Sequence, residues 1–296
     1  MKKALVALVV AGVLVAITLA VVRRPREPVY DGETLSYWME HYYRSSAGSL
    51  MVVNPSAREA VRAAGTNALP YLIRWMNRPV RWEGDVNYPY WALHGFEVLG
   101  PEAKPAIPDL VGLLGKCGNY TDLALAAIGR EAVPAITNFL ATNRNFRAHF
   151  SACGAFSYMG TNAESAVPCL IGCLKRPYPA GAAGALAAVG HNRPGEVIPA
   201  LVEALGQSGG YAAVEVAEAL GSFGPAAAEA VPALLAASTN RPADVRTHAA
   251  AALQRIAPET PNALGPLIRN LYTGTASEIQ QALWTLKQLG TNGAAA

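Results

Sequence analysis

The chain has 296 residues, of which 52% are hydrophobic and 15% are charged, and its formal net charge is +3. The positive excess comes from basic residues before position 28, and the rest of the chain is close to neutral. A nucleic-acid-binding protein needs a concentrated basic face to displace counterions from phosphates. The composition therefore argues against nucleic acid as a partner.

The N-terminal segment, residues 1–28, has the pattern of a membrane anchor. Two lysines precede an uncharged, mostly apolar run over residues 4–22, and two arginines follow it. A helix of that length rises about 28 Å, close to the hydrocarbon core of ~30 Å. We expect an uncleaved signal anchor in the inner membrane, with the remaining residues on the periplasmic or extracytoplasmic side. A cleaved signal peptide is the alternative, because Thr18-Leu19-Ala20 resembles a cleavage site.

Residues 29–53 are expected to form a capping helix and a loop. Thr34 is the predicted N-cap of a short helix, and the segment from Ser45 to Asn54 is the predicted loop. Terminal units of a repeat array need closure, so we expect the apolar face of this helix to cover the first repeat. That face consists of Leu35, Trp38, Met39 and Tyr42.

Residues 54–296 repeat one pattern. An alanine-rich stretch ends at a glycine in six of the seven units, and a motif with a proline at its second position follows. Successive motifs begin 26 to 38 residues apart. Two helical segments at such a period predict an all-α solenoid of about seven helical hairpins, preceded by the single membrane helix. The motifs are LPYLIRWM (69–76), IPDLVGLL (107–114), VPAITNFL (133–140), VPCLIGCL (167–174), IPALVEAL (198–205), VPALLAAS (231–238) and LGPLIRNL (264–271), the last with its proline shifted by one.

The tripeptide Gly-Thr-Asn occurs at Gly65, Gly160 and Gly290. At the first two positions we expect the glycine to end one helix, the Thr-Asn pair to cap the next, and the proline to open it. At Gly290 the same residues lead into a terminus that we expect to be frayed. The tripeptide is interpreted as a structural joint and not as a ligand loop.

The recurring glycine and proline resemble those of a HEAT-repeat array, and the short unit with alanine-rich first helices is most similar to the HEAT-like repeats of bilin-lyase-type proteins. The resemblance covers residues 54–296. The family's Asp-x-Val-Arg opening survives only as Asp244-Val245-Arg246, so we expect stacking to depend on apolar packing. The resemblance implies a scaffold or adaptor, and as an alternative a tetrapyrrole (bilin)-type lyase or a ligand chaperone.

The motifs of known catalytic and metal sites are absent from the sequence, including the P-loop, the dinucleotide fingerprint and the helical zinc motif. The histidines never pair at ligand spacing, and each is interpreted as a surface or helix-end residue. We therefore predict no catalytic residue, no metal site, no cofactor and no enzymatic activity. The five histidines are His41, His94, His149, His191 and His248.

The cysteines allow two interpretations. Cys169 and Cys173 share one helix face, and Cys153 lies on the partner helix of the same hairpin. A disulfide from Cys153 to either of them is one possibility in an oxidising compartment. The other is that these residues and Cys117 replace alanine as small buried side chains.

Two surfaces are candidates for binding a protein partner. In arrays of this type the second helices line the concave face, where Trp75, Leu113 and Phe139 form one column with Tyr71 beside it. The alternative is that these side chains pack between neighbouring second helices. The second surface is the loop over residues 77–91, which carries Trp82 and Tyr88 next to arginines.

These observations predict a non-enzymatic protein–protein interaction scaffold, tethered to the membrane through residues 4–22. The partner is a protein that the sequence does not identify.

Overall fold

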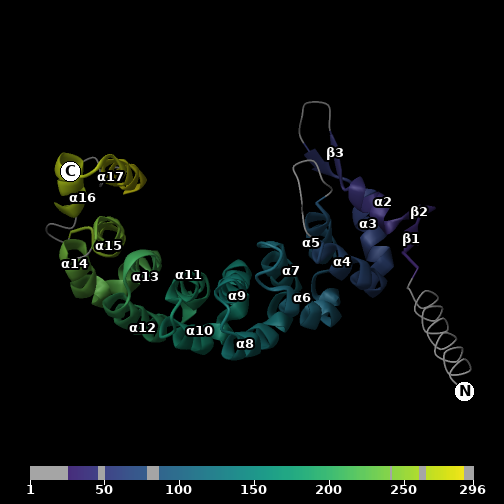
Figure 1. Ribbon diagram of the computed structural model, residues 1–296, viewed down its shortest axis with the longest axis horizontal. Coiled ribbons are helices and arrows are strands. Elements are labelled where there is room, and N and C mark those ends of the chain that lie inside the picture. Colours follow the sequence, from purple (N-terminus) through teal and green to yellow (C-terminus); the bar gives the residue numbers. More distant parts are fainter. Residues whose placement is uncertain (1–25, 46–50, 79–86, 241, 260–264, 290–296) are drawn as a thin grey trace, which may run out of the picture.

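The computed structural model describes residues 26–45, 51–78, 87–240, 242–259 and 265–289. They form an arc of helical hairpins with a small capping segment at the N-terminal end (Figure 1). The predicted helical solenoid is therefore confirmed for the described residues, which are mostly but not entirely helical. The predicted membrane helix over 4–22, Trp82 and the terminus after Gly290 lie outside them.

The capping segment contains the predicted helix and two short strand pairs. Helix α2 (Leu35–Glu40) is capped by the Thr34 hydroxyl, which accepts a hydrogen bond from the backbone N–H of Tyr37. Its predicted apolar face is buried. The segment from Ser45 to Asn54 is not wholly a loop, because β4 (Met51–Val53) pairs with β3 (Tyr43–Ser45) in antiparallel register. The other pair is β1 (Val29–Tyr30) with β2 (Glu33–Thr34).

Seven hairpins follow, each with a first and a second helix, and one further helix closes the array. The first helices are α3 (Pro55–Ala64), α5 (Tyr88–Leu99), α7 (Tyr120–Ile128), α9 (Phe146–Met159), α11 (Pro179–Val189), α13 (Gly210–Ser222) and α15 (Ala243–Ile256), and α17 (Ala276–Leu289) is the closing helix. The second helices are α4 (Leu69–Met76), α6 (Ile107–Leu113), α8 (Val133–Thr142), α10 (Val167–Leu174), α12 (Pro194–Gln207), α14 (Val231–Asn240) and α16 (Gly265–Thr273).

Within each of the first six hairpins a 3-10 turn joins the two helices. These turns are η1 (Gly65–Ala68), η2 (Gly100–Ala106), η3 (Gly129–Ala132), η4 (Gly160–Ala166), η5 (Gly190–Asn192) and η6 (Gly224–Ala230). At Gly160 the backbone has φ +56°, which a residue with a Cβ adopts only with strain, and so the glycine ends α9 as predicted. The predicted cap by the Thr-Asn pair is wrong, because no side chain caps α4 or α10. The 3-10 turn continues directly into each helix and leaves the Thr and Asn side chains exposed.

Gly190 is required for a different reason. Its φ is −89°, which any residue can adopt, but a Cβ added there would lie 2.8 Å from Cγ2 of Val197. Here close approach of α12 to the end of α11 requires the glycine.

The first helices line the inner side of the arc and the second helices line its outer side (Figure 1). This corrects the expectation that second helices line the concave face. The array bends in this direction because the residues between neighbouring first helices are small. A Cβ added at Gly221 of α13 would lie 3.1 Å from Cα of Ala252 in α15. Small residues let the first helices approach more closely than the second helices do, so the array bends toward them.

One apolar core runs through the array from α2 to α15, because each hairpin buries its apolar stripes against its neighbours. A separate small cluster at the C-terminal end contains Ala250, Leu267 and Ala282. The stretch Tyr120–Thr142 is long and apolar enough to cross a membrane. It consists of α7, η3 and α8 and turns at Gly129, and its side chains Leu125 and Ile136 are fully buried in the core.

Candidate interaction surface

The predicted column on the second helices is largely buried. Trp75 and Leu113 are in the core, and Tyr71 and Phe139 are half-buried and pack against it. The ring of Trp75 is 6.3 Å from that of Tyr71 and lies edge-on to it. Since these helices also lie on the outer side of the arc, the four residues present little side-chain surface to a partner in the hollow.

Several of the exposed aromatic side chains lie at the start of first helices. Phe146 and Phe150 of α9 are 50% and 48% exposed, and Tyr178, the N-cap of α11, is 44% exposed. The ring of Phe146 lies 4.8 Å from that of Tyr178 and 6.2 Å from that of Phe150. Tyr211, at the start of α13, is 62% exposed. We name Phe146, Phe150, Tyr178 and Tyr211 the aromatic row.

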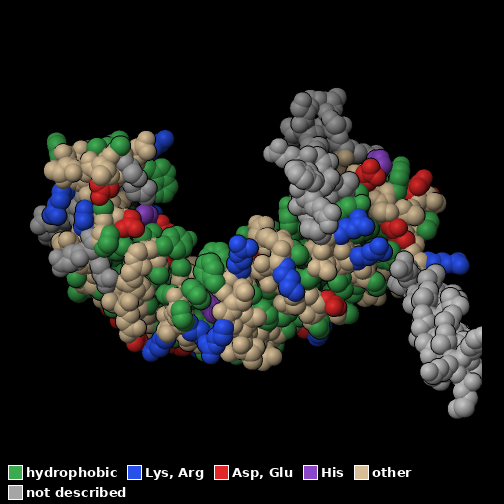
Figure 2. Space-filling view, in the orientation of Figure 1, with side chains coloured by type: hydrophobic (Ala, Val, Ile, Leu, Met, Phe, Trp, Pro, Cys, Tyr) green, Lys and Arg blue, Asp and Glu red, His purple; other side chains and the backbone are tan. Residues whose placement is uncertain are grey.

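The loops that enter α7, α9 and α11 carry cations as well as aromatic residues. All first helices run in the same direction, so the loops from second to first helices lie along one edge of the array. Lys116 precedes Tyr120, Arg144 precedes Phe146, and Arg176 precedes Tyr178. Figure 2 shows Lys and Arg side chains over α4 to α10. We name Arg78, Lys116, Arg144, Arg147, Lys175 and Arg176 the cationic edge.

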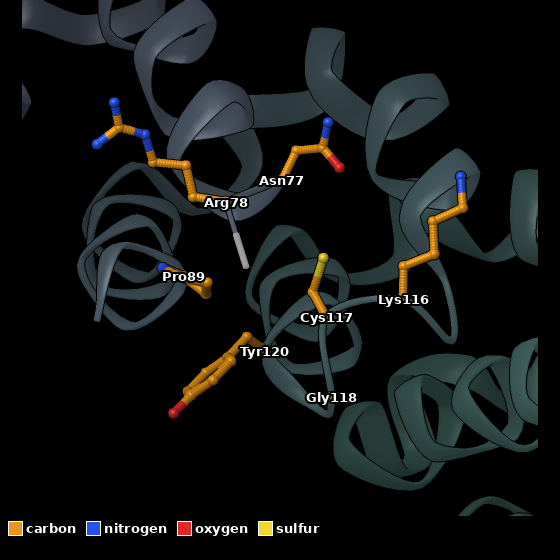
Figure 3. A pocket seen from close by; sticks show the side chains of 7 residues that line it. All are labelled: Asn77, Arg78, Pro89, Lys116, Cys117, Gly118 and Tyr120. Atoms are coloured by element: carbon orange, nitrogen blue, oxygen red, sulfur yellow. The ribbon is translucent and has the colours of Figure 1, made fainter. Parts of the chain in front are cut away.

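A cavity of about 360 Å³ opens on this edge between the first two hairpins and α7. Arg78 and Lys116 lie on opposite sides of it, with Cys117 between them and Tyr120 below (Figure 3). The Arg78 guanidinium lies 4.2 Å from the centre of the Tyr88 ring, which is half-buried. The Tyr120 hydroxyl accepts a hydrogen bond of 2.8 Å from Nδ2 of Asn87. The cavity is therefore lined by two cationic residues together with polar groups.

A second cavity of about 360 Å³ opens at the loop after α10 and includes Lys175 and Arg176. Nη1 of Arg176 donates to the carbonyl of Leu140 at 2.5 Å, which fixes the guanidinium against α8. Nζ of Lys175 lies 3.3 Å from Oε2 of Glu203, and both side chains are exposed. An exposed pair of this kind contributes little to stability and can open to admit another carboxylate.

The C-terminal part of the inner face has the opposite charge. A cavity of about 380 Å³ between α13, α15 and α17 includes Glu215, Glu218 and Asp244. Nε2 of His248 lies 3.3 Å from Oε1 of Glu218. A hydrogen bond to Glu215 raises the pKa of Tyr211 to about 12. The surface therefore changes from cationic to acidic between α11 and α13.

A buried carboxylate lies behind the cationic edge. Asp122, in the first turn of α7, accepts a hydrogen bond from the Ser151 hydroxyl of α9. Burial raises the pKa of Asp122 to about 6, although the Ser151 hydrogen bond lowers it. No local pattern in the sequence indicates that this aspartate is buried, because its partner Ser151 lies one hairpin further along the chain.

The histidines are not all at the surface, which corrects that prediction for His94 and His149. Nδ1 of His94 lies 2.6 Å from Oε2 of Glu97, and its Nε2 lies 3.1 Å from the hydroxyl of Tyr43. These partners satisfy the imidazole and attach the capping segment to α5. Burial lowers the pKa of His149, and the nearby cations lower it further.

All four cysteines are free in the structure. Cys153 and Cys173 are buried, as alanine-like residues would be, and Cys169 is half-buried. A hydrogen bond from the Cys173 thiol lowers the pKa of Cys169 to about 7, and burial raises that of Cys153 to about 12. Among the described residues, no group of three or more His, Cys, Asp or Glu side chains could hold a metal ion.

Comparison with known proteins supports the repeat assignment. A family profile described as HEAT repeats matches residues 173–254 and 198–287, which confirms the predicted resemblance. A search of curated protein sequences found no significant match.

Comparison with solved structures found matches at low identity. Kap121p bound to Pho4p has a TM-score of 0.54 and 13% identity, and the alignment covers 80% of this chain and 32% of that one. The chain thus spans about a third of the length of that protein. The complex of CpcE and CpcF of phycocyanin lyase from Nostoc has a TM-score of 0.34 and 18% identity, covering 90% of this chain and 98% of that one. Human deoxyhypusine hydroxylase has a TM-score of 0.31 and 19% identity, covering 77% and 98%.

Proposed function

We propose that this array of helical hairpins, part of which matches a HEAT-repeat profile, is a non-enzymatic scaffold that binds a protein partner along the inner side of its arc. The observation that carries the proposal is the aromatic row. Half-exposed phenylalanines are unusual on a surface that contacts only water. Burial of such a side chain in an interface stabilises a complex by about 1.5–3 kcal/mol, so these residues favour the binding of a partner.

The fold supports the proposal. An arc of stacked hairpins presents an extended concave surface, which is how such arrays bind other molecules. Kap121p, which has the same fold, has been solved in complex with another protein, Pho4p. Aromatic residues and arginine are the types that interfaces concentrate, and both occur at the start of α9.

The test is chemical crosslinking of the full chain in its native membrane, followed by purification and mass spectrometry. We expect Phe146→Ala with Phe150→Ala to lose a crosslinked partner that the unmodified chain retains. The matched control is Tyr158→Ala, which removes a 52% exposed aromatic side chain from the opposite end of α9. Equal partner recovery from all three chains would refute the proposed surface.

We also propose that residues 4–22 tether the scaffold to the inner membrane, with the array on the extracytoplasmic side. The support is the apolar run and its basic flanks in the sequence. A reporter that is active only outside the cytoplasm, fused after residue 296, should be active. A fusion that is active only in the cytoplasm would refute this orientation.

A further inference from the structure

We propose that Cys169 is a site of reversible modification by low-molecular-weight disulfides, and that the product is a mixed disulfide and not an internal one. Cys169 lies in α10, a second helix on the outer side of the arc (Figure 1). The modification is a property of this site alone, so it goes beyond the proposed function and requires no partner protein.

Two of the four thiols are open to solvent. Cys117 and Cys169 are half-buried, and Cys153 and Cys173 are buried in the core. The Sγ atom of Cys169 lies between two second helices, 4.0 Å from the carbonyl oxygen of Thr137 in α8. A dissolved reagent therefore has access to Cys117 and Cys169, whereas the core encloses the other two.

Three features around Cys169 stabilise its thiolate. Cys173 lies one helical turn further on the same face of α10, and its thiol donates a hydrogen bond to Cys169. Arg176 holds a positive charge at the end of this helix, because its backbone N–H donates to the Cys173 carbonyl and its guanidinium to the Leu140 carbonyl. Cys169 is also the third residue of α10, where the positive end of the helix dipole favours an anion. The Cys173 hydrogen bond lowers the pKa of Cys169 to about 7 against the effect of burial, and the Arg176 charge contributes.

Cys117 provides a comparison within the same chain. It is half-buried like Cys169, but it lies in the loop between α6 and α7 and not in a helix. Burial raises the pKa of Cys117, because the hydrogen bond with Thr121 and the charge of Lys116 compensate only in part. We therefore expect Cys117 to stay a thiol at pH 7 and to react slowly.

The other thiols and the imidazole of the cluster stay uncharged at pH 7. Burial raises the pKa of Cys153, in α9, to about 12. Nδ1 of His149 lies 3.9 Å from Sγ of Cys153, and burial lowers the pKa of His149 below its ordinary value. The pKa of Cys173 is raised by its hydrogen bond to Cys169 and by burial. Cys169 is therefore the nucleophile of the cluster.

The reaction is a thiol–disulfide exchange. The Cys169 thiolate attacks one sulfur of the small disulfide, the bond between its two sulfurs breaks, and a new bond joins Cys169 to the attacked sulfur. The other half leaves as a thiolate, which takes up a proton from water. Cys169 is thereby oxidised and the leaving half is reduced, so no further oxidant is needed. An excess of a small thiol reverses the reaction.

The geometry of α10 explains why the reaction stops at the mixed disulfide. Residues four apart in a helix have Cβ atoms about 5–6 Å apart, whereas a disulfide needs about 3.5–4.5 Å. Cys173 therefore cannot form a disulfide with Cys169 unless the helix distorts. Cys153 remains protonated at pH 7, and a protonated thiol does not attack a mixed disulfide.

The test exposes the full chain, in mild detergent at pH 7, to oxidised glutathione. Intact and peptide mass spectrometry should find one glutathione, attached at Cys169 and released by dithiothreitol. Cys169→Ser should prevent the modification. The matched control is Cys117→Ser, which should be modified as fast as the unmodified chain. Circular dichroism checks that each variant is folded.

Cys173→Ala tests how the site is activated. If the pKa of Cys169 returns from about 7 to its ordinary value of 9.0, its thiolate fraction at pH 7 falls about fiftyfold. The remaining thiolate becomes about eightfold more nucleophilic, because nucleophilicity rises with thiol pKa. We therefore expect the variant to react up to about sixfold more slowly at pH 7 and up to about eightfold faster at pH 10. A substitution that only loosened the packing would not reverse its effect with pH.

Four outcomes would overturn the inference. They are the absence of an adduct, equal modification of Cys117, loss of two hydrogen atoms in place of an adduct, and a Cys173→Ala variant whose relative rate is the same at both pH values. The third outcome would mark an internal disulfide. None of the four changes the crosslinking that depends on Phe146, so this inference and the proposed function can fail independently.

Discussion

Asp122→Asn should make the protein more stable at neutral pH. Burial raises the pKa of Asp122 from its ordinary value of 3.8 to about 6. The folded protein therefore holds a proton on this carboxyl at a pH where the unfolded chain has already released it. The free energy of unfolding falls as the pH rises from about 4 to about 6, and the cost remains in full at higher pH. A difference of roughly 2 pKa units corresponds to about 3 kcal/mol.

Asparagine at this position keeps the carbonyl oxygen that accepts the Ser151 hydrogen bond and removes the charge. At pH 8 we expect the free energy of unfolding of Asp122→Asn to exceed that of the unmodified chain by up to about 3 kcal/mol. At pH 4 the two should be similar, because the aspartate is then largely protonated. Urea unfolding followed by circular dichroism at pH 4, 6 and 8 measures the difference.

Asp109→Asn is the matched control. Asp109 also lies in the first turn of its helix, α6, but its side chain is exposed. The change there should be within about 0.5 kcal/mol at every pH. If Asp122→Asn proved less stable than the unmodified chain at pH 8, or if the difference did not depend on pH, the reasoning from burial would be refuted.

Three further predictions follow from packing and thiol chemistry. Gly221→Ala should lower the free energy of unfolding by about 1–3 kcal/mol, because the added Cβ meets the backbone of α15 at 3.1 Å. Gly172→Ala in α10, where the added Cβ meets open space, should raise the free energy of unfolding by about 0.5–1 kcal/mol. If urea unfolding showed the Gly221 variant to be more stable than the Gly172 variant, the packing argument would be contradicted. Peptide mass spectrometry can follow the alkylation of Cys169 by iodoacetamide. The rate should reach half its maximum near pH 7. Cys173→Ala should move that midpoint to higher pH, because the thiol that donates a hydrogen bond to Cys169 is lost. An unmoved midpoint would contradict this account. Backbone hydrogen exchange should be faster in α17 than in α9, because α17 packs in the small C-terminal cluster and α9 packs in the main core. Equal protection of the two helices would contradict this expectation.

The repeat was predictable because its signals are local. A glycine that ends a helix and a proline that opens the next are set by backbone conformation, and the sequence shows them at Gly160 and Pro168. The Thr34 cap and the buried face of α2 follow from the same kind of short-range pattern. The strand pair of β3 and β4 was missed, because Tyr43 to Val53 has no alternation of apolar and polar residues that would mark it.

The direction of curvature was not predictable from periodicity. Periodicity identifies the buried stripe of a helix but not which row of helices is closer to the centre of the arc. That depends on contacts between hairpins, such as that of Gly221 with Ala252, which the sequence shows only as a richness in small residues. The cationic edge did have a sequence signal, the recurrence of a cation before an aromatic residue in Lys116–Tyr120 and Arg144–Phe146. It was missed because the prediction considered helix faces and a single long loop.

The small residues between the first helices also determine how the arc deforms. At Gly221 the backbones of α13 and α15 are already in contact, so closing the arc compresses atoms whose repulsion rises steeply. Opening the arc separates alanine methyl groups. Each pair of atoms that loses contact gives up only about 0.1–0.2 kcal/mol of dispersion energy. We therefore expect the array to resist closure between α13 and α15 more strongly than it resists opening there.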